Sequence, residues 1–456
     1  MEMQLSDVEV LTAHDAEPMM AAAAGWLLGQ GLRSGDRVAF SMGSSSALLC
    51  AVLGAARVGI VPVVLNATLL EHERDSLLED CDPRVSILNS EDLTAMGEGP
   101  AAEMADYPLT RPMHYTSGTT GKPKGVTSGI WDSATANVAF DEEANVWGFG
   151  PSDTHLVCSP MYHTVGIRLS AATLLSGGSL IILPHFEANV ALEALRRLQP
   201  TTAFFVPTHL HRLLGLEQLG ENEIFDSLRL LMHAGAPCPP ALKREAIRRV
   251  HPNVVWEFYG ATEGQFTRCS TQEWLDHPGT VGKARPGRTL SIVPTNPSDS
   301  VGTIWCEVPS FARFSYFGDE AATNAAWDGE RFSVGDVGSL DEEGYLYING
   351  RRSDLIISGG VNVYPAEIEA ALSEIPGVRE VCVFGRDDPA WGQRVCVAIT
   401  GEASLREGDV LEGAKTLLAP YKRPKEIHLT DSLPLGPTGK ILRDQVPGHL
   451  GLDETH

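Results

Sequence analysis

Hydrophobic positions near the start of the chain follow two different patterns. Residues 18–31 (PMMAAAAGWLLGQG) and 46–59 (SALLCAVLGAARVG) are long apolar segments with glycine at the end, which is typical of buried helices. Residues 36–42 (DRVAFSM) and 60–66 (IVPVVLN) are shorter apolar runs that predict strands. Strands that alternate with helices in this way predict a parallel sheet covered by helices.

The same alternation returns in the middle of the chain. Residues 179–184 (SLIILP) and 202–207 (TAFFVP) predict buried strands, and residues 188–199 between them predict a helix. That helix would place Ala191, Leu192, Leu195 and Leu198 on one face. Residues 228–236 (LRLLMHAGA) and 254–264 (VVWEFYGATEG) each predict a strand that runs into a glycine-containing turn. Such turns, at the carboxyl ends of strands, are where open α/β sheets bind ligands.

The pattern changes after about residue 350. Residues 365–377 predict a helix with Pro365 in its first position, while residues 380–385 and 394–400 alternate with the period of two that is typical of half-buried strands. We therefore predict a large α/β domain over residues 1–350 and a small α+β domain over residues 351–456.

Composition mainly excludes functions. The formal net charge of −24 argues against nucleic acid and anionic membranes as principal partners. The first residues, MEMQLSDVEV, do not resemble a signal peptide, and we expect no membrane span because no uncharged apolar run has the necessary length. The 8 cysteines include no C-x-x-C pair, so neither a zinc site nor a disulfide framework is indicated. We expect a soluble protein of the reducing cytoplasm.

One short stretch predicts a phosphate-binding loop. Residues 115–126 (YTSGTTGKPKGV) combine glycines, hydroxyls and lysines, which together supply backbone N–H donors, side-chain donors and positive charge. The spacing differs from that of the P-loop, because Lys122 is followed by Pro123 rather than by Ser or Thr. A nucleotide bound here would belong to another fold.

Four further stretches follow at wide spacing, and they extend the same chemistry. They are FYGATEG (258–264), SVGDVG (333–338), GRRSDLIISGG (350–360) and LPLGPTGKILR (433–443). Taken in order, the five stretches resemble the adenylate-forming superfamily, which comprises acyl- and aryl-CoA synthetases, firefly luciferase and peptide-synthetase adenylation domains. The resemblance extends from about residue 20 to residue 446, and PMYHTVG, VPTHLHRLL and DDPAWGQRV are most similar to acyl- and aryl-CoA ligases.

The resemblance implies an α/β fold and a reaction. The fold would have a large N-terminal domain, with α/β sheets and a small β-barrel-like subdomain, and a small mobile α+β C-terminal domain. The reaction would couple a small-molecule carboxylic acid to CoA with ATP and Mg²⁺, through an acyl-adenylate. Coupling to AMP is needed because a free carboxylate is a poor electrophile.

The resemblance also assigns the nucleotide-binding residues. The phosphate loop would contribute Thr116, Ser117, Gly118, Thr119, Thr120, Gly121 and Lys124. Tyr259, followed by Gly260, would stack on adenine, Thr262 would bind the α-phosphate and Glu263 would hold Mg²⁺. Asp336 would accept the ribose hydroxyls, with Arg351 near the same sugar, and the loop at Gly235 and Ala236 would line the adenine and acyl pockets. A surface turn, a core tyrosine with a helix cap, and a structural aspartate are the alternatives for these segments taken singly.

Lys440 is the residue that we expect to act most directly in catalysis, because the resemblance places it between the carboxylate and the α-phosphate. A lysine near the end of a chain is ordinarily a solvated surface charge, but PTGKILR favours the catalytic role. His163 would lie at the wall between the acyl and pantetheine channels, where it gates or orients the acid; a buried core histidine is the alternative. His209 and His233 have weaker claims.

Coenzyme A would bind residues of the small domain. Trp391 would stack on its adenine, Arg423 and Lys425 would bind its 3′-phosphate, and Gly359 and Gly360 would line the pantetheine tunnel. The alternative for Arg423 and Lys425 is a solvated basic turn. The small domain would rotate about Ser353, which departs from the family's usual Asp or Lys, or about Asp354.

Two other functions stay open, and the acid is not identified. An adenylation enzyme could load a carrier protein instead of CoA, or the chain could be a non-catalytic nucleotide-binding regulator. The pocket segments HTVGI, PTHL, HAGAP and TEGQF are small and apolar, which favours a monocarboxylic fatty, alicyclic or aromatic acid. Arg168 lies just beyond HTVGI and stays open as the partner of a second carboxylate.

Overall fold

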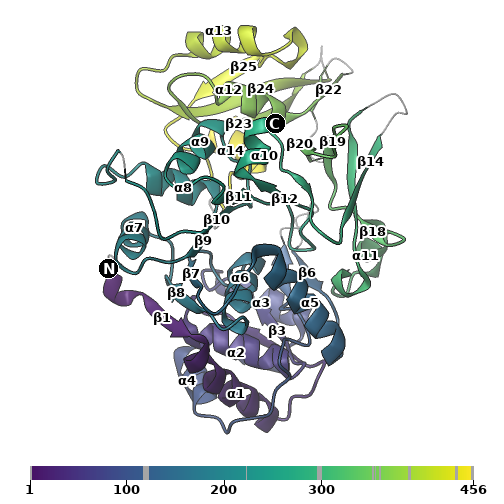
Figure 1. Ribbon diagram of the computed structural model, residues 1–456. Helices are drawn as coiled ribbons and strands as arrows, with labels where there is room; N and C mark the ends of the chain where they lie inside the picture. Colours follow the sequence, from purple (N-terminus) through teal and green to yellow (C-terminus); the bar gives the residue numbers. More distant parts are fainter. Residues whose placement is uncertain are drawn as a thin grey trace.

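The computed structural model describes most of the chain. The described residues are 3–116, 123–221, 223–294, 300–351, 354, 356–358, 361–388, 392–436 and 440–452, with the backbone alone at 351, 357, 361, 362, 392 and 421. Figure 1 shows two parts: a large N-terminal one, coloured purple to green, and a small C-terminal one at the top, coloured yellow-green to yellow.

An eight-stranded sheet forms the centre of the large part, in the order β1-β8-β7-β9-β10-β11-β12-β13. Strands β7 to β11 run parallel to one another, and β1, β12 and β13 are antiparallel additions at the edges. The bounds are β1 Glu9–Thr12, β7 Thr154–Val157, β8 Ser179–Ile182, β9 Thr202–Phe205, β10 Leu230–His233, β11 Val255–Glu257, β12 Thr267–Ser270 and β13 Lys283–Ala284. The parallel sheet predicted from the sequence is confirmed.

Helices cover both faces of this sheet, because successive residues of each strand point to opposite sides. Leu180 and Ile182 of β8 pack in one core with α1 and α2, whereas Ile181 packs in another core with α7 and α8. The helices around the sheet are α5 Ser133–Trp147, α6 Thr164–Leu175, α7 Ala188–Arg197, α8 Pro207–Leu214, α9 Pro240–Arg248 and α10 Thr271–Asp276, and the short η1 spans Leu5–Asp7.

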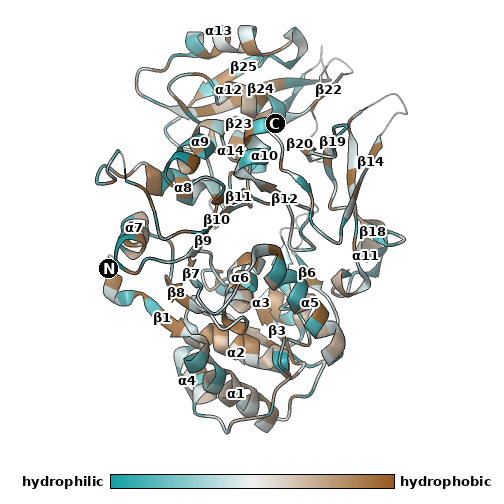
Figure 2. Ribbon diagram, in the orientation of Figure 1, coloured by the Kyte–Doolittle hydropathy of each residue, from teal (hydrophilic) through white to brown (hydrophobic). Residues whose placement is uncertain are grey.

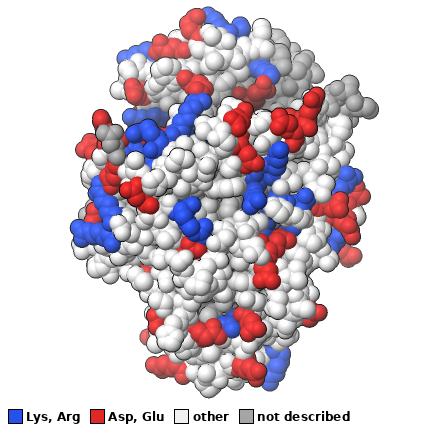
Figure 3. Space-filling view, in the orientation of Figure 1, with Lys and Arg blue, Asp and Glu red and all other residues white. Residues whose placement is uncertain are grey.

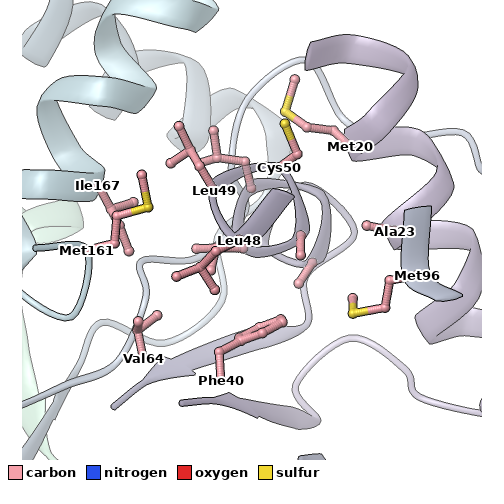
Figure 4. Close-up of a cluster of buried hydrophobic side chains, with 14 of the residues drawn as sticks. Met20, Ala23, Phe40, Leu48, Leu49, Cys50, Val64, Met96, Met161 and Ile167 are labelled. Carbon is pink, nitrogen blue, oxygen red and sulfur yellow. The ribbon is translucent and has the colours of Figure 1, made fainter. Parts of the chain in front are cut away.

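A three-stranded parallel sheet with its own helices lies at the bottom of Figure 1. Its strands are β2 Arg37–Phe40, β3 Val61–Val64 and β4 Val85–Ile87, and its helices are α1 Ala13–Gly29, α2 Ser46–Arg57, α3 Glu71–Cys81 and α4 Ser90–Gly97. Helix α2 is buried from Leu48 to Arg57 and is mostly brown in Figure 2. Figure 4 shows Leu48 and Leu49 of α2 among Phe40, Met20 and Met161.

Helix α1 begins at Ala13, five residues before the predicted start at residue 18. The side chain of Thr12 accepts a hydrogen bond from the Asp15 N–H and caps the helix there. Pro18 therefore lies inside the helix rather than at its first position. The predicted start at residue 18 was wrong because the prediction followed the apolar run, whereas the first turn of the helix is polar and begins at the Thr12 cap.

Two antiparallel sheets form the small β subdomain. One contains β14 Thr289–Pro294, β15 Gly302–Glu307, β17 Trp327–Asp328, β18 Arg331–Phe332, β19 Asp336–Leu340 and β20 Leu346–Arg351; the other contains β5 His114–Thr116, β6 Lys124–Thr127 and β16 Ser315–Tyr316. They share a core that includes Val126, Ile304, Phe314 and Phe332. Helix α11 spans Glu320–Ala326, and the short η2 spans Ser310–Ala312.

The C-terminal part has a separate sheet and a separate core. Its strands, in the order β22-β21-β24-β23 with β25 beside β24, are β21 Ile356–Ser358, β22 Val361–Val363, β23 Val378–Asp388, β24 Gly392–Gly401 and β25 Glu426–Leu429. Its helices are α12 Pro365–Leu372, α13 Glu407–Leu417 and α14 Val446–His449, with the short η4 Pro420–Lys422 and η5 Arg443–Gln445. The chain leaves the preceding sheet with β20 and enters this one with β21, and the domain boundary near residue 351 stays a prediction.

The distribution of surface charge and the length of the apolar helices bear on the partners considered from the composition. On the face shown in Figure 3, basic side chains lie among acidic ones rather than in one broad basic surface. Among the described residues, no helix is long and apolar enough to cross a membrane.

Candidate active site

A cavity of about 890 Å³ lies where the parallel strands of the large sheet end. Ser159 follows β7, Val206 follows β9 and Ala234 follows β10, and all three line the cavity. The glycine-containing turns after β10 and β11 also line it, as expected for ligand sites at the carboxyl ends of such strands. The cavity brings together many residues predicted from the sequence: Thr116, Lys124, His163, Gly235, Ala236, Gly260, Thr262, Glu263 and Lys440.

The predicted adenine and ribose partners lie in contact with each other. The Tyr259 hydroxyl donates a hydrogen bond to Asp336 Oδ2 at 2.6 Å. Arg351 of β20 pairs in register with Asp336 of β19, so the three positions meet although they are widely separated along the chain. Tyr259 also packs against Phe266, with ring centroids 4.9 Å apart.

The ends of the phosphate loop face the predicted metal ligand. Thr116 and Lys124 pair across β5 and β6 and both line the cavity. The Tyr316 hydroxyl donates to Glu263 Oε1 at 2.7 Å, and the same ring lies 5.0 Å from Lys124 Nζ. Tyr316 therefore orients both the predicted Mg²⁺ ligand and a phosphate-binding lysine. The loop residues Ser117, Gly118, Thr119, Thr120 and Gly121 lie outside the described residues.

Glu263 suits a magnesium ion that also binds a nucleotide. Among the described residues, no group of three or more His, Cys, Asp or Glu side chains could hold a metal ion. Mg²⁺ that bridges phosphates uses one or two protein carboxylates, and water and phosphate oxygens supply its other ligands. A single carboxylate that lines the cavity and is held by Tyr316 meets this requirement.

Lys440 comes to the cavity from the C-terminal part of the molecule. Leu435, Gly436 and Lys440 all line the cavity. The Gly436 N–H donates to the Lys440 carbonyl at 2.8 Å, and Leu435 forms a bridge with Ile441. This local pairing links the residues on the two sides of the segment that leads to Lys440.

Comparison with known proteins identifies the family. A family model described as "AMP-binding enzyme" matches residues 4–108 and 110–316, and one described as "AMP-binding enzyme C-terminal domain" matches residues 367–440. The chain belongs to the AMP-binding enzyme family. The resemblance to adenylate-forming enzymes drawn from the sequence is confirmed.

Related AMP-binding enzymes match over almost their whole lengths. A 2-succinylbenzoate–CoA ligase of Bacillus mycoides (strain KBAB4) is 31% identical over 438 residues, which cover 91% of this chain and 89% of the relative. ATP-bound MatB from Rhodopseudomonas palustris has a TM-score of 0.84 and 28% identity, with 96% of this chain and 93% of that chain covered. The o-succinylbenzoate CoA synthetase MenE from Bacillus subtilis, in complex with the acyl-adenylate intermediate OSB-AMP, has a TM-score of 0.81 and 28% identity, with 97% and 93% covered. The predicted fold class is confirmed.

His163 has the environment of a cavity-lining group. It immediately precedes α6, and its ring packs against Tyr162 with centroids 4.3 Å apart. Nε2 is buried and has no hydrogen-bond partner among the described residues. Burial lowers the pKa of His163 to about 4, so the imidazole is neutral at pH 7. An unsatisfied ring nitrogen beside a cavity favours contact with a ligand over the core-histidine alternative.

The two weaker histidine candidates separate clearly. His209 lines the cavity and stacks on Phe186, with centroids 3.8 Å apart. His233 lies at the end of β10 in the protein interior, 4.0 Å from Glu257, and does not line the cavity.

Arg423 and Lys425, the described residues among those predicted to bind CoA, do not line the cavity. Arg423 Nε donates to the Leu418 carbonyl at 2.9 Å, and its Nη2 donates to the Lys415 carbonyl at 3.0 Å, so its guanidinium satisfies carbonyls at the end of α13. Lys425 precedes β25 and does not line the cavity either. Trp391, Gly359, Gly360 and Ser353 lie outside the described residues, as does the side chain of Arg351. Their CoA-binding and hinge roles stay predictions.

Proposed function

We propose that this AMP-binding enzyme is a carboxylate–CoA ligase that converts a carboxylic acid, ATP and CoA to acyl-CoA, AMP and diphosphate through an acyl-adenylate. The observation that carries the proposal is a single cavity lined by Thr262, Glu263 and Lys440. Curated relatives are named as CoA ligases, and a similar structure contains an acyl-adenylate, which supports both the acceptor and the intermediate.

The first half-reaction joins the acid to AMP. A carboxylate oxygen of the acid attacks the α-phosphorus of ATP, and the bond from that phosphorus to the oxygen shared with the β-phosphate breaks. Negative charge increases around the α-phosphate and the leaving diphosphate, so fixed positive groups and donors stabilise the transition state. Lys440 and Thr262 serve this purpose in our assignment. Glu263 would hold Mg²⁺, which neutralises phosphate charge when it is bound.

The second half-reaction transfers the acyl group to CoA. The thiol gives its proton to water, its sulfur bonds to the acyl carbon, and the bond from that carbon to the phosphate oxygen breaks, so that AMP leaves. His163, which is neutral at pH 7, can donate one ring N–H to an oxygen of the acid. It therefore orients the acyl group at the wall of the cavity.

The two steps would use two placements of the C-terminal domain, because Lys440, which lines the cavity in this structure, and the predicted tunnel residues Gly359 and Gly360 cannot all attend one adenylate at the same time. Asp354, one of the two hinge candidates, forms an ion pair with Arg443, with Oδ2 and Nε 3.4 Å apart. Arg443 lies three residues after Lys440 and also donates to Glu369 at 2.8 Å. We propose that the C-terminal domain rotates about the backbone of Ser353 or Asp354. Arg443 and Lys440 lie beyond that point in the chain and would move together.

Two alternative functions fit the chain less well. Loading of a carrier protein requires no site for a 3′-phosphate, so the CoA contacts predicted for Trp391 and Lys425 weigh against it, as do the relatives named as CoA ligases. A non-catalytic regulator would not need Lys440 and Glu263 in one cavity. We also propose a cytoplasmic location, because all eight cysteines are free.

The test is an assay with the full chain, ATP, Mg²⁺ and a panel of carboxylic acids. We expect acid-dependent pyrophosphate release, followed by thioester formation with free CoA. Thioester formation only with a phosphopantetheinyl carrier protein would favour the first alternative. ATP binding without pyrophosphate release for any acid would favour the regulator.

A further inference from the structure

A second cavity, of about 180 Å³, lies beside the active-site cavity and shares a wall with it. Thr164, Arg168, Thr262, Glu263 and Gln265 line both. Four arginines line the second cavity together with two glutamates of α5, and we call this group the arginine cluster. Its members are Arg111, Arg168, Arg285, Arg288, Glu142 and Glu143.

Arg285 and Arg288 together form ion pairs with both glutamates of the cluster. Arg285 Nη2 lies 2.9 Å from Glu142 Oε1, and its Nη1 lies 3.0 Å from Glu143 Oε2. Arg288 forms a bidentate pair with Glu142, with distances of 2.8 and 3.2 Å. The side chains of Arg285 and Arg288 are only 4% and 5% exposed. These contacts link α5 to the connection between β13 and β14. Arg285 and Arg288 therefore have a structural role.

The arginine cluster as a whole carries more positive than negative charge. The four guanidinium groups face two carboxylates, so the cluster carries two surplus positive charges. Glu263 also lines the cavity, and one surplus charge remains even if it is counted. His114, the remaining titratable group on the wall, is neutral at pH 7 because burial lowers its pKa to about 4. Burial and the neighbouring arginines likewise lower the pKa of Arg111 to about 10, which still leaves it charged.

Arg168 is the member of the cluster that reaches the active-site cavity. Its Nε lies 3.3 Å from Glu143 Oε1, and its guanidinium lies over the Phe258 ring at 5.3 Å. Nη2 is buried and makes no hydrogen bond among the described residues. A buried guanidinium N–H without an acceptor is costly, and a carboxylate is the group whose geometry suits it.

The position of Arg168 on α6 suits contact with the far end of the acid. It lies five residues after His163, which corresponds to a rise of about 7.5 Å along a helix. His163 and Lys440 are assigned to the reacting carboxylate, and Arg168 lines the same cavity further along α6, with its guanidinium over the Phe258 ring. An acid of moderate length would place its other end at this guanidinium.

We propose that the acid substrate carries a second anionic group, a carboxylate, and that Arg168 binds it with the rest of the arginine cluster supplying the surplus positive charge. The proposal rests on the proposed ligase function. It replaces the monocarboxylic acid favoured from the sequence, where Arg168 could not be placed relative to the pocket. Arg168 is thus a specificity-determining residue for the acid.

The experiment compares dicarboxylic acids of increasing length with their monomethyl esters, which keep one carboxylate and nearly the same shape. Pyrophosphate release is measured with the full chain and with the variants Arg168→Gln, Arg168→Lys and Arg268→Gln. The last is the matched control, because Arg268 packs on Trp256 and donates to the Val146 carbonyl but lines neither cavity. Thermal unfolding and the KM for ATP monitor folding and the nucleotide site.

For at least one diacid we expect kcat/KM to exceed that of its monoester by about 10- to 100-fold, the range expected for one charged hydrogen-bonded contact. Arg168→Gln should lose this preference through a higher KM for the diacid, Arg168→Lys should retain part of it, and Arg268→Gln should retain all of it. The inference alone is overturned if monoacids and monoesters are used but diacids are not, or if Arg168→Gln slows all acids equally. No pyrophosphate release with any acid would overturn the ligase function together with the inference.

Discussion

Two buried charged clusters of the large domain differ in charge balance and in what they contact. In the first, Lys243 of α9 donates to Glu257 of β11 and lies 4.8 Å from the Trp274 ring, beside His233. Burial lowers the pKa of His233 to about 4, so this cluster has one positive and one negative charge at pH 7. None of the three lines either cavity. The arginine cluster has excess positive charge and lines the second cavity, and its member Arg168 lines both cavities.

The difference shows how buried charges with a structural role can be distinguished from buried charges that bind ligands. A balanced pair closed off from cavities is satisfied by the protein itself, so its loss should affect stability. Charges that line a cavity and exceed their counter-charges are satisfied only when a ligand is present, so their loss should affect substrate use. Lys440 and Glu263 also line the active-site cavity, so their loss should likewise affect substrate use.

The largest expected effect concerns a charge that lines the cavity. Lys440→Ala should slow acid-dependent pyrophosphate release by about 10²- to 10³-fold, since it removes a positive group from the charge that develops at the α-phosphate. Its free energy of unfolding should stay within about 0.5 kcal/mol of the wild type. Presynthesised acyl-adenylate should still react with CoA. Near-normal adenylation by this variant would remove Lys440 from the assignment.

The opposite outcome is expected for the balanced cluster. Lys243→Met leaves Glu257 buried without its counter-charge and should lower the free energy of unfolding by about 3–5 kcal/mol, measured by denaturant unfolding. The matched double variant Lys243→Met/Glu257→Leu should recover most of that loss, because it removes both charges. The folded fraction of the Lys243→Met variant should show the same preference among carboxylic acids as the wild type. A changed acid preference would contradict the structural role of this cluster.

The smallest effect concerns the pH dependence of stability. His233 has a folded-state pKa of about 4, below the ordinary value of 6.5, so its contribution to stability is present above pH 6.5 and is lost as the pH falls towards 4. Each such histidine contributes about 1.4 kcal/mol per pH unit in that window, since only the unfolded state binds the proton. His233→Phe should reduce the slope of the free energy of unfolding against pH by the amount that corresponds to about one proton. An unchanged slope would show that folding does not lower the pKa of His233.

The sequence predicted the parts of the molecule that depend on local pattern. The alternation of helices and strands, the glycine-containing turns after β10 and β11, and the gathering of Thr262, Glu263 and Lys440 all follow from motifs in which a few adjacent residues determine the chemistry. Tyr316, which orients Glu263, was missed because nothing in its local sequence indicates that its strand pairs with β6.

The arginine cluster could not be predicted for the same reason on a larger scale. Arg111 precedes β5, Glu142 and Glu143 lie on α5, Arg168 lies on α6, and Arg285 and Arg288 follow β13. These residues share no motif and meet only because two helices and the antiparallel β subdomain pack around one cavity. The CoA role of Arg423 stays a prediction: in the structure its guanidinium donates to carbonyls at the end of α13, a contact that the local sequence did not indicate.

The central claim is that the cavity containing Glu263 and Lys440 forms an acyl-adenylate before CoA reacts. Mass spectrometry of the full chain incubated with ATP, Mg²⁺ and an accepted acid, without CoA, tests it directly. The account predicts enzyme-bound acyl-AMP and an equal amount of pyrophosphate, followed on addition of CoA by loss of acyl-AMP and the appearance of acyl-CoA and AMP. Formation of ADP and phosphate, or of acyl-CoA without pyrophosphate, would contradict it.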